Sequence, residues 1–439
     1  MAKPCADLLV TGAGQLVTPC GKGPAIGDDL GRLRIIADGA VAVAGERVLA
    51  VGTTDEVLSQ VETGPATVLV DAGGCVVLPG LVDPHTHALY AGSRQRELEM
   101  KLRGLDYLAI LASGGGILST VSQTRAAQPH YLGELLRERL RVMLAHGTTT
   151  VEIKTGYGLT EADELAHLEI LARLEKDGLP DVVATLMAAH AVPEEWTHDP
   201  DGYIDLIRHR IIPAAAAAGT AKFVDVFCES GVFSREQTRL VLVAAREHGL
   251  SCKLHADELT PGGGAELAAE AGAISAEHLI HTSPEGVKAM AAVGVIAVLL
   301  PGTSFYLAKG AYAPARAMIE AGVPVALATD ANPGTSPTEN MGFMLTLACL
   351  YLRMTPAEAV TAATLNAACA LGLGDQIGSL EPGKLADLAV FAAPDYQYLP
   401  YHYGVNLTRT VIKRGRVVWH SPSAPPSVER GIMDNKRRI

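Results

Sequence analysis

Eight short apolar stretches, each separated from the next by a helical pattern, constrain the fold of this chain more than any other feature. Regular alternation of strand-like apolar runs with helices is typical of a parallel α/β architecture. Eight such strands predict a closed (β/α)8 barrel, the TIM barrel. The predicted strands cover residues 76–84, 148–153, 182–188, 223–227, 251–254, 274–277, 295–300 and 324–328.

The segments on either side of the barrel have a different pattern. Residues 7–78 read as short strands punctuated by glycine-rich turns, which indicates a small sheet or sandwich. Only three strand-like stretches follow the barrel, too few to form a stable unit alone. We therefore predict that they complete the N-terminal sheet as one composite β-sandwich domain. The predicted division is 1–78 and 377–439 for this domain, C-terminal tail included, and 79–376 for the barrel.

Charge and hydropathy exclude several classes of partner. The 439 residues carry a formal net charge of −12, whereas nucleic-acid binding needs clustered Lys and Arg. No apolar run reaches the roughly 18 to 20 residues that a membrane span needs, and the N-terminus lacks a signal-peptide hydrophobic region. Seven cysteines without regular spacing indicate reduced thiols. We therefore expect a cytoplasmic protein without nucleic-acid or membrane partners.

The first predicted barrel strand ends in two histidines, His85 and His87. Residues i and i+2 of a strand point to the same face, so both imidazoles project to one side. Neutral imidazole is the commonest protein ligand for several metals, and such a pair needs one or two more ligands to complete a site. An isolated His-x-His has an equally good explanation without chemistry, so the interpretation depends on the rest of the chain.

Further polar residues stand where other predicted strands end. Active sites of (β/α)8 barrels lie at the C-terminal ends of the strands. Each residue has an alternative role, since His190 or His278 could be a hydrogen-bonded core histidine and Asp330 a helix N-cap. Together they favour a metal site. Besides His85 and His87, the set comprises Lys154, His190, His255, Glu258, Glu277, His278 and Asp330.

We assign one metal ion, divalent or trivalent, to His85, His87, His255 and Asp330. Such an ion lowers the pKa of bound water from about 15.7 towards about 7 and polarises a carbonyl group, which suits hydrolysis of an amide. Asp330 could also accept the proton of the water. Three histidines and an aspartate suit zinc and iron alike.

Two further residues receive catalytic roles. Glu258, three residues past a ligand, could carry a proton to the leaving nitrogen. The alternative for Glu258 is an ordinary surface carboxylate. His278 is placed to stabilise the oxyanion or to orient the nucleophile.

This arrangement of motifs resembles the amidohydrolase superfamily. The shared features are His-Thr-His after strand one, His on strands five and six, and Asp after strand eight. The resemblance implies the composite sandwich beside the barrel. Members with two metals usually carry a carboxylated Lys after strand four, where this chain has Cys228 and Glu229, and Lys154 follows strand two. One metal is therefore expected.

Within that superfamily the chain resembles the imidazolonepropionase family over nearly its whole length. The resemblance rests on stretches such as residues 83–87, 92–94, 113–117, 152–158, 189–193, 253–258, 276–278 and 329–335. Members hydrolyse 4-imidazolone-5-propanoate to N-formimidoyl-L-glutamate in L-histidine degradation, and a homodimer is expected from the family. The residues that would contact this small anionic heterocyclic substrate are Arg94, Tyr157, His190, Glu258, Asn332, Gly334 and Thr335.

Arg94 agrees with that substrate on physical grounds, because a guanidinium offers a fork suited to a carboxylate. Its alternative is a surface arginine, since Arg96 and Arg103 are nearby. Three positions depart from the pattern expected of the family: Ala331, where Phe is anticipated, and Thr155 and Thr335, where Ser is frequent. None of these departures removes a proposed metal ligand.

Two other functions remain open from the sequence. The same metal chemistry would serve an amidohydrolase of another small cyclic amide or a deaminase of a heterocycle, and only the pocket would differ. A non-catalytic barrel used as a scaffold is the third hypothesis. Such a scaffold should have lost ligands, whereas all four are present here together with Glu258 and His278.

Overall fold

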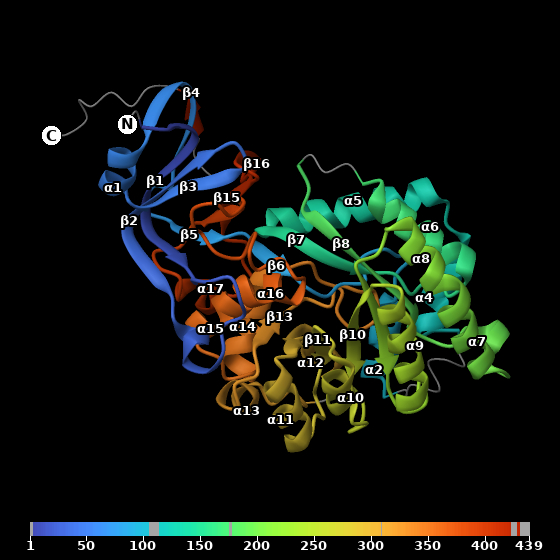
Figure 1. Ribbon diagram of the computed structural model, residues 1–439. Helices are drawn as coiled ribbons and strands as arrows, with labels where there is room; N and C mark the ends of the chain where they lie inside the picture. The colour runs from blue at the N-terminus through green and yellow to red at the C-terminus, as the bar shows by residue number, and fades with distance from the viewer. Residues whose placement is uncertain (1–2, 105–113, 175–177, 309, 423–427, 431–439) are drawn as a thin grey trace.

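The computed structural model describes residues 3–104, 114–174, 178–308, 310–422 and 428–430. Eight parallel strands form one sheet, hydrogen-bonded in the order β13-β12-β11-β10-β9-β8-β7-β6, which confirms the predicted barrel (Figure 1). The strands are β6 (Leu81–Asp83), β7 (Thr148–Lys154), β8 (Asp181–Ala189), β9 (Phe223–Cys228), β10 (Ser251–Ala256), β11 (Ser275–His278), β12 (Ile296–Leu299) and β13 (Val325–Leu327).

The barrel closes between its first and last strands through side chains and loops. Thr329, just past β13, donates from its N–H and its hydroxyl to the buried Asp83 carboxylate at 3.1 and 2.5 Å. Beyond this point Thr86 and Ala331 form a parallel bridge. The closure therefore joins the two loops that carry His85 and Asp330 and holds their backbones side by side.

Helices cover the outside of the barrel, as the alternating pattern predicts (Figure 1). Two of the longer helices are α5 (Pro129–Ala145) and α9 (Arg235–Glu247). None of the described helices is long and apolar enough to cross a bilayer. The other helices around the barrel are α6 (Glu161–Ala172), α7 (Pro200–Leu206), η3 (Ile207–Ile211), α8 (Ile212–Ala218), α10 (Gly264–Ala271), α11 (Pro284–Val293), α12 (Pro301–Leu307), α13 (Ala315–Glu320), α14 (Met341–Tyr351), α15 (Pro356–Ala362) and α16 (Leu365–Ala370).

Strands from both ends of the chain share a second sheet, as predicted, and Figure 1 shows it beside the barrel. Its main path runs β16-β15-β14-β5-β1-β2-β3, with β4 paired to β1 and β17 to β4. The junction of the two chain segments is antiparallel, with Val77 opposite Val390. The strands are β1 (Cys5–Thr18), β2 (Arg34–Ala44), β3 (Arg47–Thr53), β4 (Glu62–Asp71), β5 (Val76–Pro79), β14 (Leu388–Phe391), β15 (Thr408–Lys413), β16 (Arg416–His420) and β17 (Val428–Arg430).

Apolar side chains from both chain segments form a common core of this composite sheet. Leu16, Val77 and Leu388 belong to one buried cluster, although they come from opposite ends of the sequence. The smaller elements of the chain are α1 (Thr54–Gln60), α2 (Gln95–Leu102), α4 (Ile117–Ala126), α17 (Tyr398–Tyr401), η1 (Gly27–Gly31) and η2 (Glu194–Trp196).

One continuous strand over residues 76–84 was expected, and this prediction is wrong at Gly80. Strand β5 belongs to the composite sheet and β6 to the barrel, and Gly80 carries the chain from one to the other. Its N–H donates to the carbonyl of Asp387 at 2.9 Å. A Cβ at this position would lie 2.2 Å from the Thr149 hydroxyl, so only glycine fits the crossing.

A cluster of ion pairs connects the barrel to the composite sheet. Asp181, the first residue of β8, lies 2.6 Å from Lys413 and 3.0 Å from Arg414. Lys413 also lies 2.6 Å from the buried Asp387. Burial alone would raise the pKa of Asp181, but Lys413 and Arg414 outweigh burial and hold this pKa below its usual range.

Asp181→Asn is expected to lower the free energy of unfolding by about 1–3 kcal/mol near pH 7, because a charged partner of two cations is lost. A carboxylate with a depressed pKa contributes its stability above the unfolded-state pKa of about 4 and loses it as the pH falls through the folded-state value. Urea unfolding from pH 3 to pH 7 should therefore show the two proteins converging in acid. A constant difference across this range would contradict the role of the charge.

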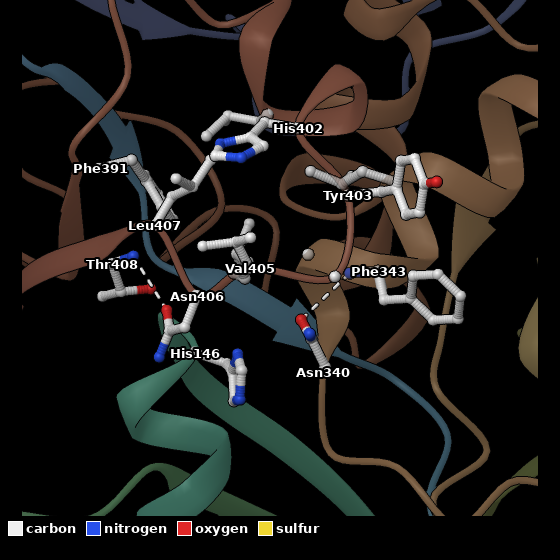
Figure 2. A pocket seen from close by; sticks show the side chains of 15 residues that line it. His146, Asn340, Phe343, Phe391, His402, Tyr403, Val405, Asn406, Leu407 and Thr408 are labelled. Carbon is white, nitrogen blue, oxygen red and sulfur yellow. Dashed lines mark hydrogen bonds between the residues drawn. The ribbon is translucent and has the colours of Figure 1, made fainter.

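A small hollow lies where the barrel meets the composite sheet (Figure 2). His146, Asn340, Phe391 and Thr408 are among its lining residues. It occupies about 30 Å³, which is room for about one water molecule rather than for an organic substrate. It lies at the N-terminal end of β6, because Leu81 also lines it, and none of the predicted site residues belongs to it.

Candidate metal centre

Three histidines and one aspartate meet at the C-terminal end of the barrel. His85 and His87 follow β6, His255 lies in β10, and Asp330 follows β13. All four residues are at least 97% buried. The Nε2 atoms of His87 and His255 are 3.3 Å apart, and Asp330 Oδ1 lies 3.4 Å from His85 Nε2 and 3.7 Å from His87 Nε2. The structure therefore brings together all four residues that the sequence predicts as ligands.

These distances fit a small metal ion. Zinc–nitrogen bonds of about 2.0–2.1 Å in a tetrahedron place neighbouring ligand atoms about 3.4 Å apart. His85, His87 and His255 each present a ligand atom within 4.8 Å of the others. His85 Nε2 is buried and has no hydrogen-bond partner among the described residues, a costly arrangement unless a ligand binds there. The donor set is thus suited to a divalent ion.

Burial keeps most of these imidazoles neutral. The pKa values of His85 and His87 lie well below the usual range, chiefly because burial disfavours the charged form. Burial also lowers the pKa of His255, but the adjacent Asp225 carboxylate outweighs burial, so the net effect is a raised pKa. A neutral imidazole offers a nitrogen lone pair to a metal, as the site requires.

Two carboxylates behind the ligands set the orientation of the rings. Glu277 Oε2 lies 2.8 Å from Nδ1 of His85, and Asp225 Oδ2 lies 3.1 Å from Nδ1 of His255. A neutral histidine in such a contact carries its proton on Nδ1 and leaves Nε2 as the ligand atom. Glu277 is predicted from the sequence at a strand end but without this role, and Asp225 is not predicted from the sequence.

Asp330 is held by its neighbours in an uncommon backbone conformation. The hydroxyl of Thr303, in α12, donates to Oδ2 at 2.5 Å, so Oδ1 is the atom that faces the histidines. Asp330 and His278 have φ angles of +55° and +66°, in the left-handed region that non-glycine residues rarely adopt. Such strained residues cluster at functional sites, where the surrounding fold enforces them.

Glu258 and His278 lie next to the ligands and to each other. Glu258 Oε2 is 3.5 Å from His278 Nε2, and both side chains are at least 90% buried. The ring of His278 lies 5.1 Å from that of His255, measured between centroids. The surface carboxylate considered as the alternative for Glu258 does not fit this burial.

Arg94 is buried and already paired. Its Nε and Nη2 each lie 2.9 Å from a carboxylate oxygen of Glu97, and only 12% of the Arg94 side chain is exposed. The Gly116 N–H also donates to Glu97, at 2.8 Å. The surface-arginine alternative is therefore excluded. The sequence analysis missed Glu97, although its i+3 spacing from Arg94 is the signal of such a pair.

Aromatic rings connect the ligands to Arg94. The ring of His190 stacks on His87 with 4.6 Å between centroids, and Tyr157 packs 5.3 Å from His190. Burial raises the pKa of Tyr157, and the positive charge of Arg94 opposes this effect. Arg94 therefore lies close enough to share an environment with Tyr157 and His190.

The loop after Asp330 contains the other predicted contact residues. Asn332 uses its whole side-chain amide within the loop, accepting from the N–H groups of Gly334 and Thr335 at 2.8 Å and donating to Asp330 O and Thr335 Oγ1. A Cβ at Gly334 would lie 2.1 Å from Arg94 Nη1. Asn332 thus shapes the loop, while Gly334 leaves room for the guanidinium.

Two of the three positions that depart from the family pattern, Ala331 and Thr155, are buried structural positions. Ala331 packs in an apolar cluster, and its carbonyl accepts from the N–H of His87 at 3.0 Å. The Thr155 hydroxyl accepts from the N–H of Met187 at 2.9 Å. Ser113, part of a motif quoted above, lies outside the described residues.

A (β/α)8 barrel that gathers these ligand groups at the C-terminal ends of its strands, beside a sheet built from both chain ends, has the architecture of an amidohydrolase. The model of the amidohydrolase family matches residues 76–418. An adenosine deaminase from Xanthomonas campestris with bound zinc has the same fold, with a TM-score of 0.70, 21% identity, and coverage of 98% of this chain and 95% of that one. Guanine deaminase from E. coli has a TM-score of 0.68, 18% identity, and coverage of 94% and 99%.

Much closer sequences identify the branch of this family. An imidazolonepropionase from Shouchella clausii (strain KSM-K16) is 49% identical and covers 98% of this chain and 96% of its own length. One from Geobacillus thermodenitrificans (strain NG80-2) is 51% identical, with coverage of 94% and 97%. The chain belongs to the amidohydrolase family and, within it, to the imidazolonepropionases.

Proposed function

We propose that this chain hydrolyses the cyclic amide C–N bond of 4-imidazolone-5-propanoate to give N-formimidoyl-L-glutamate, the reaction of imidazolonepropionases in histidine degradation. One observation carries this proposal from the geometry: the loop that follows the candidate ligand Asp330 places Gly334 directly against the Arg94 guanidinium, so a group of metal-ligand side chains and a largely buried arginine lie beside each other. A hydrolytic centre and a carboxylate anchor are the two features that this substrate requires. Sequence identities of 49% and 51% to two imidazolonepropionases, over nearly the full length of the chain, support the same reaction.

His85, His87, His255 and Asp330 would hold one metal ion, zinc or iron. Such an ion supplies Lewis-acid chemistry, which activates water and polarises a carbonyl group. The hydrogen bond from Thr303 restricts Asp330 to one free oxygen, and Glu277 and Asp225 restrict His85 and His255 to one free nitrogen each. The protein therefore presents the ligand atoms in fixed directions before any ion binds.

Glu258 is assigned the proton transfer to the leaving ring nitrogen. Hydrolysis adds water across the bond between the C4 carbonyl carbon and the ring nitrogen, so the nitrogen must gain a proton as that bond breaks. The carbonyl carbon then becomes the α-carboxylate of the product. His278 lies 3.5 Å from Glu258, and burial keeps its pKa low, so the neutral ring can steady the carbonyl oxygen by hydrogen bonding.

Arg94 is assigned to the propanoate carboxylate. Glu97 engages Nε and Nη2, and Nη1 faces the backbone of Gly334, so Nη1 is the atom directed toward the loop after Asp330. Tyr157 and His190 would contact the ring of the substrate beside His87. His190 Nδ1 lies 3.0 Å from the carbonyl oxygen of Gly156, which leaves Nε2 for a ligand.

Arg94→Ala is expected to raise KM for the propanoate substrate by about 10- to 100-fold, the effect of losing a charged hydrogen bond. Turnover at saturation should fall much less, because the metal ligands and Glu258 are untouched. Steady-state kinetics would measure both constants. Arg96→Ala is the matched control, since Arg96 is exposed and precedes Glu97. An unchanged KM for Arg94→Ala would place the carboxylate anchor elsewhere.

The proposed function is tested with purified, metal-analysed protein and 4-imidazolone-5-propanoate, following the ultraviolet absorbance of the ring and the mass of the product. We expect N-formimidoyl-L-glutamate without immediate release of ammonia, and loss of activity on chelation. No conversion by metal-replete protein would overturn the proposed substrate and direct the search to other cyclic amides. Release of ammonia would indicate a deaminase. The expected homodimer and cytoplasmic location stay predictions.

A further inference from the structure

Below the candidate metal centre, the barrel interior contains five charged side chains in place of an apolar core. They project inward from β7 and, on the other side of β8, from the adjacent strands β9, β10 and β11. All five are fully buried. We call this group the buried charge network, and its members are Glu152, Lys154, Asp225, Lys253 and Glu277.

Glu152 is the centre of this network. One of its carboxylate oxygens lies 2.9 Å from Lys154 Nζ and the other 3.0 Å from Lys253 Nζ. The hydroxyl of Thr185 donates to the second of these oxygens. Glu152 thus joins the two lysines and touches none of the four candidate metal ligands.

Each lysine in turn contacts a carboxylate that orients a ligand histidine. Lys154 Nζ lies 2.7 Å from Asp225 Oδ2, the atom that faces Nδ1 of His255. Lys253 Nζ lies 3.9 Å from Glu277 Oε1, and the other oxygen of Glu277 faces Nδ1 of His85. Two series of contacts therefore lead from Glu152 to candidate ligands. One passes through Lys154 and Asp225 to His255, and the other passes through Lys253 and Glu277 to His85.

Stability alone does not explain this network. Taking charges out of water is costly, and well-packed apolar residues are often as stabilising as a buried ion pair or more so. Three carboxylates and two ammonium groups contact one another below the ligands. Partners of metal-ligating histidines fix ring orientation and ligand basicity, and their loss weakens metal binding.

We propose that Glu152, Lys154 and Lys253 are positioning residues for the metal: they hold Asp225 and Glu277 so that His255 and His85 direct Nε2 into the site. The inference rests on the proposed metal centre and goes beyond it, because these residues act without touching the metal or the substrate. His85, Asp225 and Glu277 could themselves hold a cation, and an ammonium group lies beside each of the two carboxylates.

Glu152→Gln tests the proposal, because it removes one charge with almost no change in shape. Zinc affinity of the full chain is measured by competition with a chelating dye, at a temperature where circular dichroism shows the metal-free proteins folded. We expect affinity to fall about 10- to 100-fold. Asp387→Asn is the matched control, since Asp387 is a buried carboxylate paired with a lysine in the composite sheet. It should lower the melting temperature and leave zinc affinity unchanged.

Wild-type zinc affinity in a folded Glu152→Gln protein would overturn the proposal, whatever its melting temperature. If that variant does not fold, Thr185→Val removes only the hydroxyl that donates to Glu152 and keeps all five charges. It should weaken zinc binding several-fold, and unchanged affinity would overturn the proposal equally. A wild-type protein that binds no zinc or iron would instead refute the metal centre itself, and this inference with it.

Discussion

His255→Ala is expected to abolish metal retention and, with it, hydrolysis. His255 supplies one of four candidate ligand groups, and its Nε2 lies 3.3 Å from that of His87. Alanine would leave three ligands and would remove the imidazole partner of Asp225, which stays paired with Lys154. The loss of metal affinity should exceed the about 10- to 100-fold that removal of a ligand's hydrogen-bond partner costs. Metal analysis after dialysis and the hydrolysis assay measure the two effects.

His146→Ala is a suitable control for this experiment. His146 is partly buried, but it lines the hollow of Figure 2 at the other end of the barrel strands. It should retain metal and activity. Full metal content in His255→Ala would remove His255 from the ligand set.

Glu258→Gln is expected to leave the metal bound and to reduce turnover by about 10² to 10⁴-fold, the range for lost acid–base catalysis. Glutamine preserves the shape of the side chain and a contact with His278, but it cannot carry the proton to the leaving nitrogen. KM should change little. Stopped-flow or steady-state turnover on metal-matched samples provides the comparison.

Glu285→Gln, on the exposed side of α11, serves as the control for a lost carboxylate. Wild-type turnover in Glu258→Gln would show that another group donates the proton. Loss of metal from Glu258→Gln would instead indicate that Glu258 supports the ligands.

Residues that repeat with a simple period were predictable from the sequence. The barrel strands appear as apolar runs because both of their faces are buried, as in β12 and β13. His85 and His87 share a face through the two-residue period of an extended chain. The histidines and Asp330 were recognisable because they follow such runs, where barrel active sites lie.

Contacts between residues far apart in the chain were not predictable in this way. Asp225 contacts His255 across the paired strands β9 and β10, and Glu277 contacts His85 across the barrel, and no local pattern encodes either contact. One signal was present nonetheless. Lys253 lies two residues before His255, and Glu152 lies two residues before Lys154. In each of these buried strands, a charged residue therefore interrupts the apolar run and shares a face with the polar residue two positions later. The passage of the chain from the composite sheet to the barrel at Gly80 was not predictable, because β5 and β6 on either side of it are both apolar.

The position of β5 has a consequence for the order in which the chain folds. One edge of β5 is covered by β1, which is synthesised before it, and the other by β14, which is synthesised after the whole barrel. Until β14 emerges from the ribosome, β5 exposes an unpaired apolar edge, a feature that promotes aggregation. The last part of the chain therefore protects the newly synthesised enzyme from aggregation, because β14 covers the exposed edge of β5.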